Sequence, residues 1–139
     1  MSRLTGLAWV DVAMNMFFAV AAGGAIGAVG RYLIAGRVMH MLGAEFPFGT
    51  LTVNVFGGLL MGILVEVSAL KFNIGDELRA FLMVGILGGF TTFSSFSFEV
   101  FLLMERHQTM AAAGYVLLSV ILSVAALFVG MMAIRAVLG

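Results

Sequence analysis

The sequence predicts an all-α membrane protein whose single domain, residues 1–139, has four transmembrane helices. Of its 139 residues, 63% are hydrophobic and only 10% are charged, a balance far from that of soluble domains. The charges also leave four apolar windows, each reaching roughly the 20 residues that cross the hydrocarbon core of a bilayer. These windows lie between Asp11 and Arg31, Glu45 and Glu66, Arg79 and Glu99, and Arg106 and Arg135.

We therefore expect helices at residues 13–36, 50–70, 79–104 and 110–135. The connections between them are too short for a soluble domain, so the function belongs in the membrane. The sequence contains no cysteine, which excludes disulfides and thiolate chemistry. Its zero net charge argues against a nucleic-acid partner. His40 and His107 belong at the surface, so a serine, a histidine and an acid do not converge at one depth, and we expect no enzyme.

The first helix has a competing interpretation as a cleaved signal peptide, because Ala19, Ala21 and Ala22 resemble a cleavage site. The apolar run, however, continues through Val29, and Arg3 is the only positive charge before it. A retained transmembrane helix is the better interpretation.

The second helix carries Asn54, within TLTVNVFGG. An amide in the middle of a membrane is costly unless it is hydrogen-bonded. We therefore expect Asn54 to face a partner helix or water.

The third helix contains the unusual segment GGFTTFSSFSFEV at residues 88–100. Gly88, Gly89, Thr91 and Thr92 form helix poorly, which predicts a break near mid-membrane. Unpaired backbone is tolerated at that depth only where protein or a water-filled cavity supplies partners, so a break indicates a site. Its free carbonyls are suited to a cation. A kink that serves packing alone is the alternative.

Phe90, Phe93 and Phe96 recur every three residues and are expected to stack along one side of a helix. Phenylalanine ring edges are electropositive. The stripe could equally fill the core or face lipid. Interleaved hydroxyls favour a functional role for it; they belong to Ser94, Ser95 and Ser97.

The fourth helix presents Tyr115, Ser119 and Ser123 at four-residue spacing, which predicts a hydroxyl stripe on one face. Back-bonding to the helix's own carbonyls is the alternative. Together with Asn54, these groups offer hydrogen-bond donors and almost no fixed charge. Such a lining suits a small, hard anion that hydrogen-bonds strongly.

Glu66 and Glu99 are the ionisable residues closest to membrane depth. An acid inside the membrane is a candidate proton relay. Both also lie near enough to helix ends to be solvated groups at the interface.

The positive charges of the connections are almost evenly divided between the two sides of the membrane. Since Lys/Arg asymmetry sets the direction of insertion, this balance favours both orientations and permits antiparallel dimers. A single topology fixed by one excess charge remains the alternative. Arg3, Lys71, Arg79 and Arg135 fall on one side, and Arg31, Arg37 and Arg106 on the other.

The small-xxx-small pairs Gly23/Gly27, Gly58/Gly62 and Gly85/Gly89 let helices approach closely, within one subunit or between subunits. One four-helix bundle has little interior for a pathway. An oligomer is therefore expected.

The segment GILGGFTTFSSFSFEV at residues 85–100 resembles the bacterial fluoride channels of the Fluc/CrcB family, and the likeness extends to residues 23–32, 47–58 and 112–119. The resemblance implies an antiparallel, dual-topology homodimer with two pores in the bacterial inner membrane. This dimer, embedded in lipid, would export fluoride passively from the cytoplasm. Phe46 stands where the family commonly has tryptophan, and Ser95 where it often has threonine.

The resemblance also assigns roles to individual residues. Phe93 and Phe96 match the pore-lining phenylalanines, and Asn54 matches the asparagine of the pathway. The pathway further includes Ser94, Ser95, Glu99, Tyr115, Ser119 and Ser123. The carbonyls of Gly88 and Thr91, from both subunits, would hold a structural sodium ion on the dimer axis. Arg31 matches an arginine near the end of the first helix.

Two other functions stay open at this point. A proton-coupled fluoride antiporter would need Glu66 or Glu99 to bind and release protons. A non-conducting membrane scaffold would use the break and the hydroxyls for packing alone.

Overall fold

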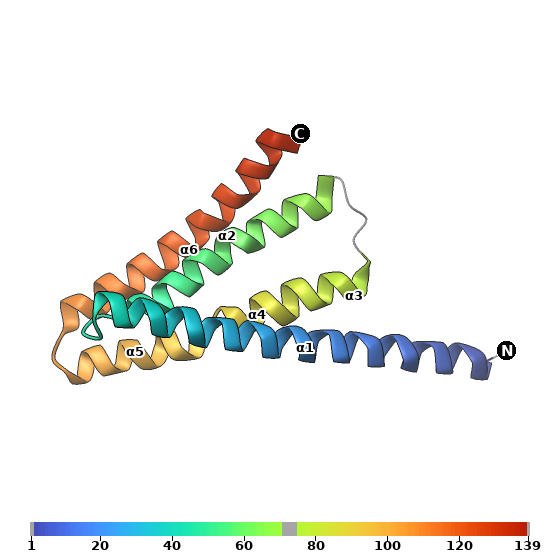
Figure 1. Cartoon of the computed structure of the whole chain (residues 1–139), viewed down its shortest axis with the longest axis horizontal. Coiled ribbons are helices and arrows are strands. Elements are labelled where there is room, and N and C mark those ends of the chain that lie inside the picture. The colour runs from blue at the N-terminus through green and yellow to red at the C-terminus, as the bar shows by residue number, and fades with distance from the viewer. Residues whose placement is uncertain (1, 71–74, 139) are drawn as a thin grey trace.

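The structure, a computed structural model, describes residues 2–70 and 75–138, with side chains from residue 13 onwards. Lys71 and the side chain of Arg3 lie outside the described residues. In chain order the elements are α1 (Ser2–Leu42), α2 (Phe48–Leu70), α3 (Asp76–Arg79), the π-helical η1 (Ala80–Leu87), α4 (Gly88–Phe90), α5 (Phe93–Glu105) and α6 (Thr109–Leu138) (Figure 1). All described elements are helical.

Four stretches are long and apolar enough to cross a membrane: Ala13–Leu42, Phe48–Leu70, Asp76–Glu105 and Thr109–Leu138. The predicted all-α class with four membrane-spanning segments is therefore confirmed. The third stretch is composite, because α3, η1, α4 and α5 follow one another within it.

The first helix continues past the expected end at residue 36, as far as Leu42. Arg37 and His40 do not stop it, since charged residues are compatible with helix. The helix ends at Gly43, which has a φ of +91° and donates its N–H to the carbonyl of Met39 at 3.0 Å. A left-handed glycine after the last turn is a common helix terminator.

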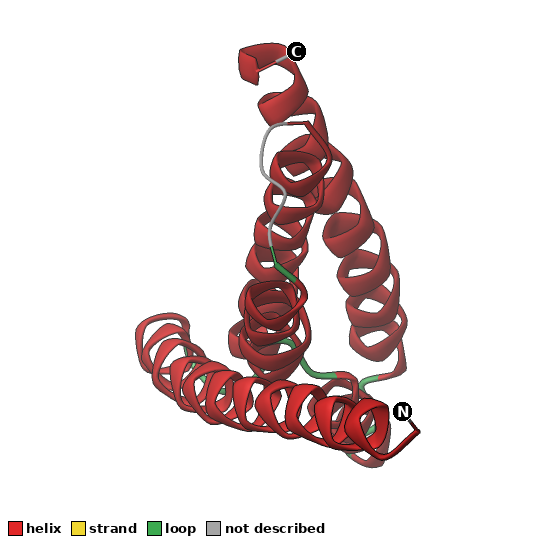
Figure 2. Ribbon diagram, turned by 90° about the vertical axis from the view of Figure 1, so that its right-hand side faces the viewer, coloured by secondary structure: helices red, strands yellow, loops and turns green. Residues whose placement is uncertain are grey.

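The long helices pack in two groups. α2 lies beside α6 along much of its length, while α1 lies beside η1 and α4 and projects beyond them at its N-terminal end (Figures 1 and 2). α5 packs against the first part of α6.

Glycines allow α1 to approach η1 and α4 at backbone distance. A Cβ added to Gly23 would lie 2.5 Å from the carbonyl oxygen of Phe81, and one added to Gly27 would lie 2.8 Å from the amide nitrogen of Phe90. From the other side, a Cβ on Gly89 would lie 2.6 Å from the carbonyl oxygen of Gly24. These small-xxx-small pairs therefore pack helices within one subunit.

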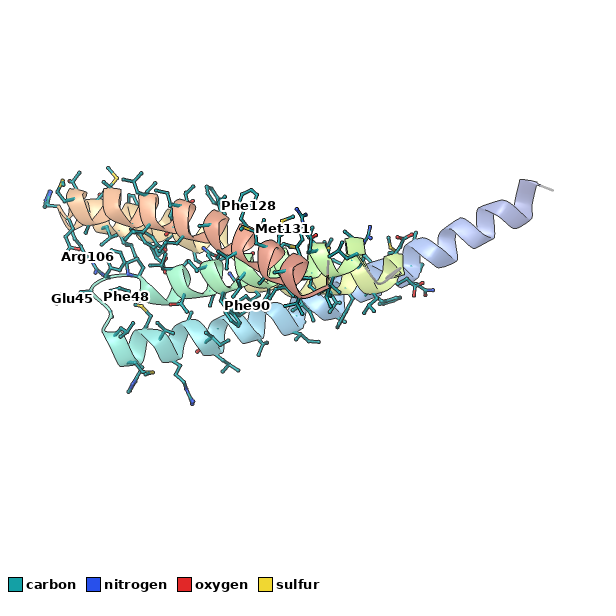
Figure 3. The ribbon with its side chains drawn as sticks, turned by 90° about the horizontal axis from the view of Figure 1, so that it is seen from above. Glu45, Phe48, Phe90, Arg106, Phe128 and Met131 are labelled. Atoms are coloured by element: carbon teal, nitrogen blue, oxygen red, sulfur yellow. The ribbon has the colours of Figure 1, made fainter. Side chains whose placement is uncertain are left out.

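The core is small and most large apolar side chains point outwards, as Phe128 does (Figure 3). This is the distribution expected of a protein that is solvated by lipid. The main buried cluster joins α5 to α6 and comprises Phe96, Leu103, Ala112 and Tyr115.

Candidate functional site

Two extended residues separate α4 from α5. Thr91 has φ −81° and ψ 160°, and Thr92 has φ −153° and ψ 125°. Gly88 and Gly89, in contrast, are helical. Although glycine is a weak helix former, the two glycines are retained in the helix, where Gly89 packs against α1. The N–H of Thr91 still donates to the carbonyl of Leu87, and the helical hydrogen bonding stops at Thr92.

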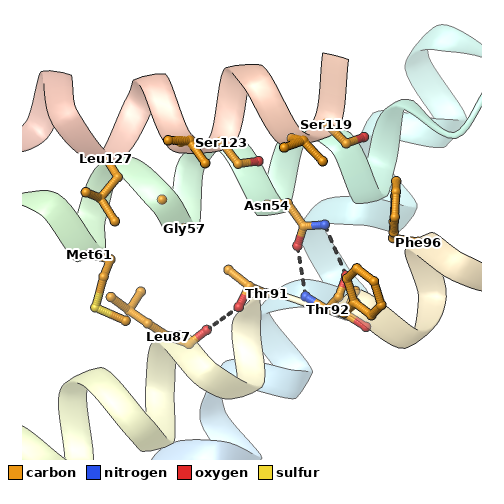
Figure 4. Close-up of a pocket in the computed structure, with 14 residues that line it drawn as sticks. Asn54, Gly57, Met61, Leu87, Thr91, Thr92, Phe96, Ser119, Ser123 and Leu127 are labelled. Carbon is orange, nitrogen blue, oxygen red and sulfur yellow. Dashed lines mark hydrogen bonds between the residues drawn. The ribbon is translucent and has the colours of Figure 1, made fainter. Parts of the chain in front are cut away.

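Asn54 of α2 supplies the hydrogen bonds that Thr92 would have in a helix. The amide N–H of Thr92 donates to Asn54 Oδ1 at 2.8 Å, and Asn54 Nδ2 donates to the Thr92 carbonyl at 3.1 Å (Figure 4). Both main-chain groups of Thr92 are thereby satisfied, as burial in a membrane protein requires. The expectation that Asn54 faces a partner helix is confirmed.

Thr92 also caps the N-terminus of α5. Its Oγ1 accepts a hydrogen bond from the amide N–H of Ser95 at 3.2 Å, in the manner of an N-cap residue. The hydroxyls of Ser94 and Ser95 lie 3.2 and 3.3 Å from the same oxygen. Both serines thus cluster around the start of α5, while neither lines the cavity described next.

A cavity of about 440 Å³ lies between this segment, α2 and α6 (Figure 4). Ser119 and Ser123 of α6 face it, and their Oγ atoms are buried without a hydrogen-bond partner among the described residues. Unpaired buried hydroxyls are costly and uncommon. The back-bonding alternative for these two serines is therefore wrong. The cavity is lined by Asn54, Gly57, Gly58, Met61, Leu87, Thr91, Thr92, Phe93, Phe96, Ser119, Val120, Ser123, Val124 and Leu127.

The phenylalanines do not form one stripe. Phe93 and Phe96 are close, with ring centroids 5.4 Å apart, but Phe93 is 78% exposed and Phe96 only 8%. Phe90 ends α4, before the extended residues, and packs near Gly30 of α1 and Phe56 of α2. The expected stacking of Phe90 with the other two is wrong, because the backbone changes direction between them.

Glu99 connects three helices through its carboxylate. Thr50 Oγ1 of α2 donates to Oε1 at 2.7 Å, and Tyr115 Oη of α6 donates to Oε2 at 2.6 Å. The Tyr115 side chain is fully buried and packs edge-on against Phe46, with ring centroids 5.5 Å apart. Thr50 was not predicted from the sequence as a site residue, although its position one helical turn before Asn54 could have indicated it.

Glu66 lies elsewhere, and its buried carboxylate forms an ion pair with an exposed arginine. Arg135 Nε donates to its Oε1 at 2.9 Å and Arg135 Nη2 to its Oε2 at 3.0 Å. The two acids are therefore held by different partners, and neither acid lines the cavity.

Three further predicted residues are Arg31, Gly88 and Thr91. Arg31 is half-buried on α1. Gly88 is exposed, and a Cβ added there would meet only the carbonyl oxygen of Met83, at 3.8 Å. Thr91 is half-buried, and both its amide N–H and its Oγ1 donate to the carbonyl of Leu87, at 3.0 and 2.9 Å.

Four apolar helices, an open cavity lined with neutral hydroxyls and an amide-supported extended segment define a multi-pass helical membrane protein. Comparison with known families makes this specific. The family model described as "CrcB-like protein, Camphor Resistance (CrcB)" matches residues 18–131, and the chain belongs to this family. The resemblance predicted from residues 85–100 is confirmed. A multi-pass protein of this family resides, in bacteria, in the inner membrane.

Curated relatives are similar along nearly their whole length. A "Fluoride-specific ion channel FluC" of Rhodospirillum centenum is 55% identical over 122 residues, covering 88% of this chain and 97% of the relative. The protein of that name from Agrobacterium fabrum is 50% identical over 112 residues, covering 81% and 90%. The one from Caulobacter vibrioides is 48% identical over 125 residues, covering 89% and 98%. These names denote channels, a class of protein that is not enzymatic.

Proposed function

We propose that this protein is a fluoride-selective channel through which fluoride leaves the cytoplasm passively. The observation that carries the proposal is the name shared by its relatives, fluoride-specific ion channel, at 46–55% identity over most of the chain. The neutral donor groups around the cavity support it, because they match the chemistry of a small anion.

The proposed pathway follows the unpaired hydroxyls of Ser119 and Ser123. Fluoride is small and strongly hydrated, so it needs close hydrogen-bond donors when it sheds water. The two hydroxyls supply such donors, and the electropositive ring edges of Phe93 and Phe96 add to them. None of the residues that line the cavity is basic. A neutral lining binds an anion weakly enough to release it, as conduction requires.

We assign the remaining predicted residues to the same route. The Glu99–Thr50–Tyr115 cluster forms one end of it, with Ser94 and Ser95 supporting the turn into α5. Arg31 belongs to the vestibule, where a cation attracts anions before they lose water.

The channel is proposed to be an antiparallel homodimer with two pores. The high exposure of Phe93 beside a cavity supports this, since a second copy would cover the ring and complete the lining. The nearly equal Lys/Arg charge on the two sides supports opposite orientations of the two copies.

We further propose that Thr91 and Thr92 lie near mid-membrane and that the carbonyls of Gly88 and Thr91 bind a structural sodium ion between the two subunits. In a continuous helix these carbonyls would accept from the N–H groups of Thr92 and Ser95. Those N–H groups instead donate to Asn54 Oδ1 and Thr92 Oγ1. Carbonyls released from a helix in this way suit sodium.

Removal of sodium is expected to abolish fluoride current in purified, reconstituted protein, and its return should restore the current. The physical reason is that the freed carbonyls of two subunits would repel one another without a cation. Planar-bilayer recordings in sodium salts and in N-methylglucamine salts of equal ionic strength test this. Equal currents after exhaustive sodium removal would contradict the sodium site while leaving the channel in place.

Phe93→Ile is expected to reduce fluoride efflux from liposomes several-fold, because it removes the aromatic edge yet keeps an apolar side chain. A fluoride electrode follows the efflux. Phe128→Ile is the matched control, since Phe128 is exposed on α6 and does not line the cavity. Folded wild-type protein without any efflux would favour the scaffold function.

The same liposomes distinguish a channel from a proton-coupled antiporter. We expect the rate of fluoride efflux to be independent of an imposed pH gradient. The hydrogen bonding supports this, because both oxygens of Glu66 and both oxygens of Glu99 already accept protein hydrogen bonds. Acceleration by a proton gradient would favour the antiporter.

A further inference from the structure

The Glu66–Arg135 ion pair joins α2 to α6, and neither of its residues lines the cavity. Its geometry is bidentate, with N–O distances of 2.9 and 3.0 Å. The side chain of Glu66 is 4% exposed and that of Arg135 is 66% exposed. Among the residues that the structure describes, the carboxylate is hydrogen-bonded by this guanidinium, and its burial leaves little room for water.

The close contacts between α2 and α6 recur every four residues along both helices. A Cβ added to Gly58 would lie 2.5 Å from the Ser123 carbonyl oxygen, and one on Gly62 would collide with the carbonyl oxygen of Leu127. Glu66 is the next residue of this row on α2. Helical side chains lean towards the N-terminus, so Arg135 reaches back to it from further along α6.

Followed towards the N-termini of α2 and α6, the same two series of residues lead into the cavity. Asn54 precedes Gly58 by one turn, and Ser119 precedes Ser123 by one turn. All four residues line the cavity. The axial position of α6 relative to α2 therefore decides which hydroxyl lies opposite the Asn54 amide.

We propose that the Glu66–Arg135 pair is a register lock that holds the Ser119 and Ser123 hydroxyls at their positions beside Asn54. This inference rests on the proposed function, since it concerns the fluoride pathway. The glycines bring the two backbones together but supply no side chains that interlock along α2. The bidentate pair fixes position along the axis, because a slip of one turn, about 5.4 Å, would separate the charges. Glu66 and Arg135 are thus positioning residues.

The test compares full-length reconstituted protein with a double variant, Glu66→Leu with Arg135→Leu, which removes the lock without leaving a buried charge. The readouts are the fluoride/chloride reversal potential in planar bilayers and the efflux per folded protein. Reversal potential does not depend on how many channels are folded, so a role in stability alone would not change it. We expect the double variant to show reduced fluoride selectivity and several-fold slower efflux.

Glu66→Gln provides a second variant that keeps the shape of the side chain and one acceptor. It should shift the reversal potential in the same direction by a smaller amount. Arg79→Gln is the control, because it removes an exposed arginine expected on the same side of the membrane and should leave both readouts unchanged. Wild-type reversal potential and efflux in Glu66→Gln, or in a folded double variant, would overturn the register lock. Wild-type protein without fluoride current would overturn the proposed function instead.

Discussion

Asn54→Leu is expected to abolish fluoride efflux while the protein still inserts into the membrane. The substitution removes both hydrogen bonds to the main chain of Thr92. A buried backbone group left unpaired costs about 1–3 kcal/mol, so the extended conformation at Thr91 and Thr92 loses most of its support. The Thr92 N–H would then return to the Gly88 carbonyl and close the helix. Fluoride-electrode assays of liposome efflux measure the outcome.

Asn15→Leu is the matched control for this experiment. Asn15 also donates a side-chain hydrogen bond, to Glu77 Oε1 at 3.2 Å, but the contact is exposed and joins α1 to α3. Its loss should leave efflux close to the wild-type rate. If Asn54→Leu conducted as well as Asn15→Leu, the extended segment would be stable without the amide, and its proposed role in the pathway would fail.

The four membrane-spanning segments were predictable because charges delimit them. The positions of the helix ends were harder to predict. α1 ends at Leu42, and the left-handed φ of the following Gly43 matters more for this than the charges of Arg37 and His40. The π-helical turns of η1 have no distinctive residues within AFLMVGIL. The hydrogen-bond pattern of η1 depends on its packing against other helices, and the residues of η1 alone do not predict that packing.

The residues of the candidate site were largely visible in the sequence as polar groups in apolar spans. Their partners were not. The pairing of Asn54 with Thr92, and of Thr50 and Tyr115 with Glu99, depends on how α2, α5 and α6 meet. The three-residue spacing of the phenylalanines was misleading for Phe90, because spacing predicts a common face only within one continuous helix.

No charged residue is among those that line the cavity. Glu66 and Glu99 both have their carboxylate oxygens engaged by donors, Glu66 by a guanidinium and Glu99 by two hydroxyls. Unpaired donors remain at Ser119 and Ser123. An anion in the cavity would therefore meet neutral hydroxyls, and neither acid is among the residues that line it. This is the balance that a weak, rapidly exchanging anion pathway requires.

Gly27→Ala is expected to prevent α1 from docking and to lower the yield of folded protein sharply. Its Cβ would collide with the Ile86 carbonyl oxygen and lie 2.8 Å from the Phe90 nitrogen, both main-chain atoms. Neither atom moves without the helix, so overpacking should cost about 1–3 kcal/mol or more. Size-exclusion recovery and thermal unfolding in detergent measure the loss. Gly36→Ala, with no atom within 4 Å, is the control and should match wild type. Equal stability of the two variants would mean that α1 packs less closely against η1 and α4 than described, which would also loosen the framework on which Thr91 and Thr92 depend.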